Sequence, residues 1–298
     1  MMATAALDGR GSPDLRLPFR LTLALGVLLA GSALVGLSAG LSGLYERYPA
    51  SEAGMFAQDL VVLFVVLPVL AASVVSARRG SVPARLAWAG TLFYAAYTYY
   101  FMVIGAFTVM FPAYVAIVAV STYTLLALLF RTDIDAVARV VRSGAPRRAI
   151  AWFFLVTVAL FVVLWGGLVA STLVAGGTLN PVQHLVVAID GAILLPVLGY
   201  AGVQLLRRQS IGYVLAGVLI VKAGLTGFTL AFTSAFAMWW NGEVVASEAF
   251  LIAIFSVMTV VALAVWIPFA IAGRRATWVQ TGAEPPSLES GIAGRGSR

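Results

Sequence analysis

The sequence predicts an all-α fold, a polytopic bundle of transmembrane helices, and three observations support this. The chain has 298 residues, of which 61% are hydrophobic and only 10% charged, whereas soluble domains contain about 25% charged residues. Apolar runs of about 20 residues, long enough to cross a hydrocarbon core of ~30 Å, recur along it. Arginine gathers in alternate breaks between these runs. The composition therefore excludes a soluble globular domain and predicts a lipid bilayer as the partner of the chain.

Eight of these apolar runs are predicted to be membrane-spanning helices. They are too long and too uniformly apolar for the short alternating strands of a β-barrel. The third and fourth runs are separated only by a tight turn around Phe111-Pro112. The predicted spans are 19–44, 57–77, 84–107, 109–130, 149–171, 182–206, 211–237 and 247–272.

The positive charges predict how these spans are oriented. Seventeen of the 19 Lys and Arg residues lie on one side of this segmentation, and only Arg47 and Lys222 do not. Cytoplasmic loops carry the excess of Lys and Arg, so we expect both termini in the cytoplasm. The predicted location is therefore the cell membrane, which the chain crosses several times.

The chain divides into a cytoplasmic N-terminal arm (1–18), a transmembrane domain (19–272) and a disordered cytoplasmic tail (273–298). Within the domain, residues 131–148 interleave apolar residues with arginines. Either a short amphipathic helix on the anionic inner leaflet or an ordinary basic loop accounts for this pattern. The same segment separates two hairpins in which an Asp and a Pro precede an Arg-Arg pair. They indicate a weak 4+4 parallel repeat, with chance similarity as the alternative.

Two charged residues lie at the predicted depth of the hydrocarbon core. Lys222, the only lysine, interrupts the seventh run, and Asp190 interrupts the sixth. Such a charge costs about 2.5–3.5 kcal/mol on insertion scales, so it tends to face a partner, a cavity or a pathway. The two helices should form a hairpin, which places the two residues within about 10 Å of each other in depth. They form either a structural lock between helices or the centre of a functional site.

Polar residues continue from this pair towards the predicted outer face. Three threonines follow Lys222 along one face of its helix, and Gln183 shares a face with Asp190. Together they would line a substrate or proton pathway, although threonine hydroxyls also bond the carbonyls of the preceding turn. The candidate pathway residues are Asp190, Lys222, Gln183, His184, Thr226, Thr229 and Thr233.

A second polar cluster is predicted from the third and second spans. Tyr94, Tyr97 and Tyr100 lie near the centre of the third span, whereas interfacial aromatic belts lie at helix ends. Buried phenols need hydrogen-bond partners, so they either line a ligand or proton route or tie helices together. Asp59 lies at the outer end of the second span, where the helix dipole favours a carboxylate.

Several classes of chemistry are excluded. The chain has no cysteine and one histidine, so thiolate, histidine-rich metal and haem sites are not expected, and no cofactor is predicted. It lacks a phosphate-binding loop, HExxH, GxSxG and a dinucleotide fingerprint, and no catalytic residue is assigned. Its positive charge is explained by topology, so nucleic acid is not an expected partner.

Two segments carry a family resemblance. They are QDLVVLFVVLPVLAASVVSARRGSVPARLAWAGTLFYAAYTYYFMVIGAF (58–107) and AIDGAILLPVLGYAGVQLLRRQSIGYVLAGVLIVKAG (188–224). They resemble a family of uncharacterised bacterial integral membrane proteins with about eight helices. The resemblance implies the helical membrane fold and brings no substrate, cofactor or catalytic residue. Thr108 stands where the resemblance leads us to expect Asn.

The leading functional hypothesis is a small permease or transporter-like protein. It would bind a charged or polar solute, or exchange protons, between the sixth and seventh helices. The alternative is a non-transporting scaffold, sensor or assembly subunit in which Asp190–Lys222 is a structural ion pair. In that case the basic segment 131–148 or the tail would contact a protein partner. The sequence leaves that partner and the oligomeric state open, and it offers no nucleophile or metal set for an intramembrane enzyme.

Overall fold

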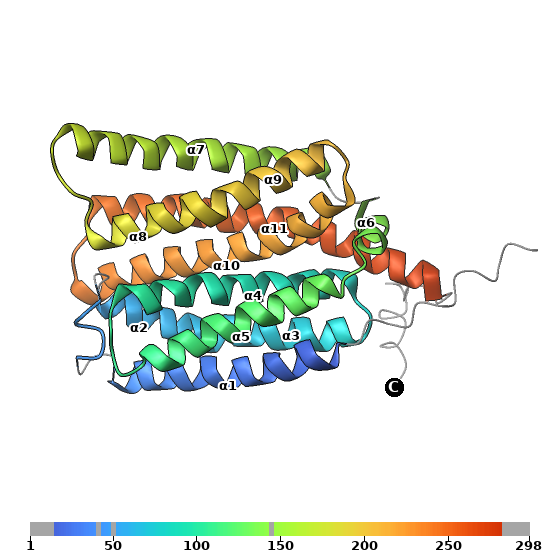
Figure 1. The fold of residues 1–298 in the computed structure, drawn as a ribbon, viewed down its shortest axis with the longest axis horizontal. Coiled ribbons are helices and arrows are strands. Elements are labelled where there is room, and N and C mark those ends of the chain that lie inside the picture. The colour runs from blue at the N-terminus through green and yellow to red at the C-terminus, as the bar shows by residue number, and fades with distance from the viewer. Residues whose placement is uncertain (1–14, 40–42, 49–51, 143–145, 282–298) are drawn as a thin grey trace, which may run out of the picture.

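The computed structural model describes residues 15–39, 43–48, 52–142 and 146–281, without the side chains of Ser247 and of 272–281. These residues form a bundle of long helices that run side by side (Figure 1). The predicted all-α fold is confirmed. Residues 1–14 of the predicted arm and 282–298 of the predicted tail lie outside the described residues.

The helices follow the predicted spans with shifted ends. In chain order they are α1 (Arg16–Ala39), α2 (Glu52–Val61), η2 (Val62–Val66), α3 (Leu67–Arg78), α4 (Val82–Gly105), α5 (Phe111–Phe130), α6 (Ile134–Arg142), α7 (Arg147–Val174), α8 (Pro181–Ile189), η3 (Asp190–Leu194), α9 (Leu195–Leu206), α10 (Ser210–Asn241) and α11 (Ala246–Thr281). The last helix continues past the predicted boundary at residue 272, into the first part of the predicted tail.

Seven helical stretches among the described residues are long and apolar enough to cross a membrane. They are α1, the continuous α2–η2–α3 and α8–η3–α9 stretches, α5, α7, α10 and α11. The remaining predicted span, 84–107, corresponds to α4, which is as long as α1, but its tyrosines and threonines lower its mean hydropathy. It packs against α3, α5 and α10 in the middle of the bundle. Its assignment as a span, and hence the count of eight, stays a prediction.

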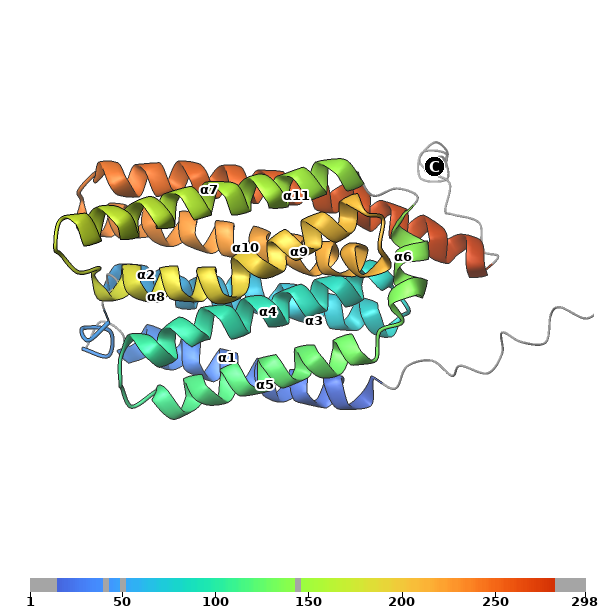
Figure 2. The same ribbon diagram turned by 45° about the horizontal axis from the view of Figure 1, so that its top comes forward.

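The first and last described helices share one end of the bundle. Figures 1 and 2 place the start of α1, the short helix α6 and the end of α11 together. An even number of antiparallel passes gives this arrangement. The cytoplasmic location of that end stays a prediction.

Helix α10 lies at the centre of the packing. It contacts α2, α4, α6, α9 and α11. At Gly90 of α4 the two backbones approach so closely that an added Cβ would lie 2.6 Å from the carbonyl oxygen of Val218. Small residues allow such close helix contacts in membranes, where packing rather than the hydrophobic effect drives association. This contact fixes α4, which carries the tyrosines, against α10, which carries Lys222.

Two of the long helical stretches widen into a π-helical segment shortly before a proline. Segment η2 precedes Pro68 and η3 precedes Pro196. In each, the residue before the proline donates its N–H to a carbonyl five residues back: Leu67 to Val62, and Leu195 to Asp190. A proline ring clashes with the carbonyl four residues back and offers no donor, and the wider turn relieves this conflict. A π-helical segment before a proline in both stretches agrees with the predicted repeat, and the repeat itself stays a prediction.

The basic segment 131–148 contains a helix, as one of the two alternatives predicted. Its apolar residues Val137, Val140 and Val141 are buried, and the helix packs against α10 and α11. Arg142 donates to the carbonyl of Arg208 at 3.2 Å, and Arg147 to that of Leu206 at 3.1 Å. The apolar face therefore rests on protein instead of the lipid leaflet, because α10 and α11 supply the surface there. The two arginines meanwhile satisfy one carbonyl at the end of α9 and one just after it.

Candidate functional site

Asp190 is held by donors from two other helices. It opens the π-helical segment η3, and only 3% of its surface is exposed. The hydroxyl of Tyr97, from α4, donates to Oδ1 at 2.5 Å, and the indole Nε1 of Trp165, from α7, donates to Oδ2 at 3.1 Å. Hydrogen bonds to the charged form stabilise a buried carboxylate. π-Helical turns occur frequently at functional sites, and this one places a carboxylate between three helices.

Lys222 meets the same tyrosine from the other side. It is also 3% exposed, and its Nζ lies 3.6 Å from the centroid of the Tyr97 ring. A desolvated cation–π contact of this kind contributes about 2 kcal/mol. The two described side chains form no direct ion pair; Tyr97 lies between them, with its hydroxyl on Asp190 and its ring under the ammonium group. We call Asp190, Tyr97, Lys222 and Trp165 the Asp190 cluster.

The three predicted pathway threonines differ in their contacts. Thr229 shares a hydrogen bond of 2.8 Å with Tyr94 and donates to the carbonyl of Leu225. Thr233 bonds the carbonyl of Leu230 at 3.2 Å. Thr226, one turn from Lys222, has a buried hydroxyl oxygen with no hydrogen-bond partner in the described part of the chain. Two of the three hydroxyls therefore have the back-bonded geometry that was the structural alternative, and Thr226 does not.

The structure does not bring Gln183 and His184 to the cluster. Gln183 completes a capping box at the start of α8, where its side chain accepts from the N–H of Asn180 and its own N–H bonds the Asn180 side chain. His184 is exposed in the next position. Both lie about two turns, or roughly 10 Å, along the helix from Asp190. Local capping of the start of α8 therefore accounts for Gln183.

The predicted second polar cluster separates into different contacts. Tyr97 belongs to the Asp190 cluster, Tyr94 bonds Thr229 of α10, and Tyr100 is 38% exposed. Tyr94 therefore ties α4 to α10. Tyr99, which is also on α4, shares a 3.0 Å hydrogen bond with Ser32 and ties α4 to α1.

Asp59 lies in a second buried site. The helix that carries it begins at Glu52, so Asp59 lies about two turns inside α2 and not in the first turn where the dipole would favour it. Tyr45, from the segment between α1 and α2, donates its hydroxyl to Asp59 Oδ2. Gly36 of α1 faces both groups, and a Cβ at this position would overlap the carboxylate and the phenol oxygen. We call Asp59, Tyr45 and Gly36 the Asp59 site.

We expect Tyr45 to make the stability of the protein depend on pH. It lies outside the membrane-spanning segments, and burial first, then the neighbouring Asp59 carboxylate, raise the pKa of its phenol. A raised pKa in the folded state gives stability that is complete below the unfolded pKa of about 10 and is lost as the pH rises above it. We expect the free energy of unfolding to fall above pH 10, by up to about 1.4 kcal/mol per pH unit for this group.

Denaturant unfolding in detergent between pH 9 and 11.5 measures this dependence. Tyr45→Phe should have a shallower decline than the parent. Equal slopes in the parent and in this variant would contradict the assignment.

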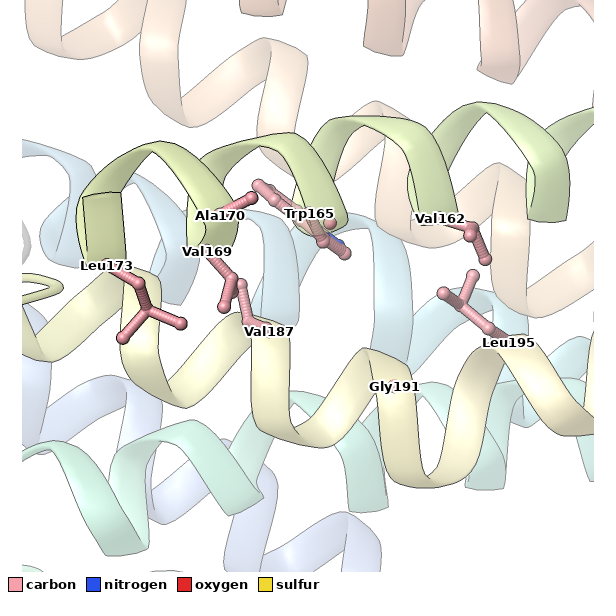
Figure 3. Close-up of a pocket in the computed structure, with 9 residues that line it drawn as sticks. Val162, Trp165, Val169, Ala170, Leu173, Val187, Gly191 and Leu195 are labelled. Atoms are coloured by element: carbon pink, nitrogen blue, oxygen red, sulfur yellow. The ribbon is translucent and has the colours of Figure 1, made fainter. Parts of the chain in front are cut away.

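An apolar groove lies beside the Asp190 cluster (Figure 3). It has a volume of about 430 Å³ and runs between α7 and the α8–η3–α9 stretch. Its lining residues are Val162, Trp165, Gly166, Val169, Ala170, Leu173, Val187, Gly191 and Leu195. The ring of Trp165 points from α7 towards the facing helix. The same residue therefore lines the groove and holds the Asp190 carboxylate.

Sequence reasoning missed Trp165 and Tyr45. The signal for Trp165 is its position inside an apolar span, away from the last turn, since tryptophans favour the ends of spans and a buried indole N–H needs an acceptor. Tyr45 gave no such signal, because its partner depends on how the segment after α1 folds back over α2.

The chain matches no protein-family model, no curated protein and no solved structure. Its resemblance to a bacterial membrane protein family therefore stays a prediction. The seven apolar helices of membrane-spanning length among the described residues make the chain a multi-pass integral membrane protein with lipid-facing helices.

Proposed function

We propose that this protein is a small permease that translocates protons, with the Asp190 cluster as its binding centre. The observation that carries the proposal is the arrangement of two opposite charges in the middle of the bundle. Asp190 and Lys222 are buried, yet they meet through Tyr97 and not directly. Intramembrane ionisable residues mark proton relays and substrate paths, and a carboxylate bonded by a phenol is a suitable proton acceptor.

Two neighbouring features support a binding site at this place. The Thr226 hydroxyl, one turn from Lys222, is buried without a partner among the described residues. A buried polar group in this state costs about 1–3 kcal/mol until something bonds it. Asp190 also begins a π-helical segment, a form of helix that is enriched at functional sites. The cluster thus has a polar group beside it, the Thr226 hydroxyl, that the contacts between helices do not use.

One observation favours the second hypothesis, a non-transporting subunit. Both carboxylate oxygens of Asp190 accept a hydrogen bond, and the Lys222 ammonium rests on an aromatic face. A lock between α4, α7, α8–α9 and α10 would need such contacts and no solute. The two hypotheses differ in whether removal of the charges abolishes an activity or only changes stability.

Proton uptake into proteoliposomes tests the proposal. The protein is reconstituted with an internal pH dye, and a potassium diffusion potential drives protons inward. We expect the parent to take up protons at least about tenfold faster than Asp190→Asn, since loss of the titrating group removes the relay. Glu243→Gln, which neutralises an exposed carboxylate between α10 and α11, should behave like the parent.

The double variant Asp190→Asn/Lys222→Met separates the two hypotheses. It lacks both charges and should fold. If the two charges form a structural lock, the double variant recovers the stability that each single variant loses. If they form a proton relay, the double variant does not recover proton uptake. We expect its proton uptake to stay at the level of protein-free liposomes. A parent protein that conducts no faster than protein-free liposomes would rule the proposal out.

A further inference from the structure

Arg85 and Arg131 each carry a buried N–H group without a hydrogen-bond partner in the described part of the chain. The two nitrogens are Nε of Arg85 and Nη1 of Arg131. Other arginines at this end of the bundle have partners, since Arg142 and Arg147 donate to backbone carbonyls. A buried donor without an acceptor costs free energy, and the cost is larger for a charged group. An acceptor from outside these residues is therefore expected at both arginines.

The fold places the two arginines at the same level of the bundle. Helix α4 ends at Gly105 and α5 begins at Phe111, and the two helices pack against each other. Arg85 and Arg131 each lie 23 residues from Thr108, the middle of the turn between the helices. Both helices rise by about 1.5 Å per residue, so equal separations from the turn give equal heights. Figures 1 and 2 show the start of α4 and the end of α5 side by side.

Both arginines also lie on packed faces of their helices. Arg85 precedes Tyr99 by 14 residues, close to four full turns, so the two share one face of α4. The ring of Tyr99 lies 5.6 Å, between centroids, from the ring of Tyr114 on α5. Arg131 follows Ile117 by the same 14 residues, and Ile117 is fully buried. The two arginines, each half-buried, therefore lie together at the end of the contact between α4 and α5.

The charges around the two arginines favour an anion. Arg85 lies in the first turn of α4, which contains no acidic residue, although the positive end of the helix dipole favours a negative charge there. Asp133, close to Arg131 in sequence, accepts the N–H of Ala136 at 2.9 Å and bonds neither buried nitrogen. Guanidinium groups match phosphate in particular, because their planar N–H donors reach two phosphate oxygens at once. Basic pockets between transmembrane helices also bind lipid headgroups.

We infer that Arg85 and Arg131 bind a phosphate group between α4 and α5. Nε of Arg85 and Nη1 of Arg131 donate to its oxygens, and the ligand holds the two helix ends together. The inference is independent of the proposed proton path, because Asp190 lies in the middle of the bundle and this site at its end. The phosphate group belongs either to an anionic phospholipid or to a free phosphate ion, since both offer the same oxygens.

Binding of dioctanoyl phosphatidylglycerol to the full chain in detergent, measured by native mass spectrometry, tests the inference. We expect the parent to bind this lipid at least about tenfold more tightly than Arg85→Gln or Arg131→Gln, because a hydrogen bond to a charged group contributes about that factor. Arg139→Gln removes an exposed charge of α6 at the same end of the bundle and should bind like the parent. Equal affinities in the three variants would overturn the inference, because attraction by general positive charge would then explain the binding.

Competition with inorganic phosphate identifies the source of the phosphate group. If inorganic phosphate displaces the lipid from the parent and binds the delipidated parent but not Arg85→Gln, the ligand is a phosphate ion. If the lipid stays bound to the parent in its presence, the ligand is a phospholipid headgroup. Both results support a phosphate site at the two arginines. A lipid that binds Arg85→Gln as tightly as the parent contradicts it.

Thermal unfolding with and without the lipid separates binding from folding. Without lipid or phosphate, Arg85→Gln should be as stable as the parent, because the donor that it removes has no protein acceptor. With phosphatidylglycerol the melting temperature of the parent should rise, since a ligand of the folded state stabilises it, while that of Arg85→Gln should not. Arg85→Lys keeps the charge but lacks Nε and the planar donors, so its rise should be smaller than that of the parent. Equal rises in the parent, Arg85→Lys and Arg85→Gln would overturn the inference.

Discussion

Lys222→Met is expected to lower the free energy of unfolding by about 3–5 kcal/mol, the cost of leaving one member of a buried charge arrangement without its counter-charge. The methionine keeps the length of the side chain, so packing in α10 changes little. What is lost is the ammonium group on the Tyr97 ring and its attraction for the Asp190 carboxylate. Asp190→Asn should cost a similar amount, because it leaves the ammonium group at the same depth.

A double-mutant cycle measures the coupling between the two charges. The free energies of unfolding of the parent, the two single variants and the double variant are compared in one detergent. We expect the double variant to cost at least 1 kcal/mol less than the sum of the two singles, as residues coupled through a shared partner do, by about 0.5–3 kcal/mol. Additive effects would show that Tyr97 does not link the two charges energetically.

Gly36→Ala is expected to destabilise the protein by about 3–5 kcal/mol. The added methyl group would overlap the Asp59 carboxylate and the Tyr45 hydroxyl, so it must displace one of them. Overpacking costs about 1–3 kcal/mol, and the hydrogen bond to a charged group that is broken contributes about 1.5–3 kcal/mol. The effect comes from three segments meeting at a single position: α1, α2 and the residues between them.

The matched control lies on the same helix. Gly31 is exposed on α1, and a Cβ there meets nothing within 4 Å. Gly31→Ala should leave the stability unchanged or raise it by up to about 1 kcal/mol, because alanine favours helix. Thermal and denaturant unfolding of both variants in detergent gives the comparison. The close approach at Gly36 is disproved if the two variants are equally stable.

The sequence was sufficient to predict the fold to the level of whole helices. Length and hydropathy located the spans because a bilayer leaves helices or closed barrels as the only ways across. Helix α4 was located in the same way as the predicted span 84–107, although its tyrosines lower its hydropathy below that of its neighbours. Its place within the bundle comes from close packing, such as the contact of Gly90 with α10, and a single sequence does not show which glycines are approached.

The candidate site could be predicted only in part. Asp190 and Lys222 were detectable because charge at membrane depth is rare and costly. Their connection through Tyr97 was not, because it depends on the rotation of α4 about its axis, which sequence spacing alone does not set. Gln183 shared the predicted face but was taken up by helix capping at Asn180. Local hydrogen bonds of this kind compete with longer-range ones.

Each π-helical segment also rotates the part of the helix that follows it, about the helix axis, relative to the part that precedes it. One extra residue in a turn rotates everything after it by about 100° relative to an uninterrupted α-helix, the angle per residue at 3.6 residues per turn. A helical wheel drawn over all of 181–206 therefore assigns the residues of α9 to the wrong sides, whereas wheels drawn on each side of η3 do not. Deleting one residue within η3 would restore a single phase and turn α9 against α7 and α10. Length variation at this point would thus act as a rotation of the helix.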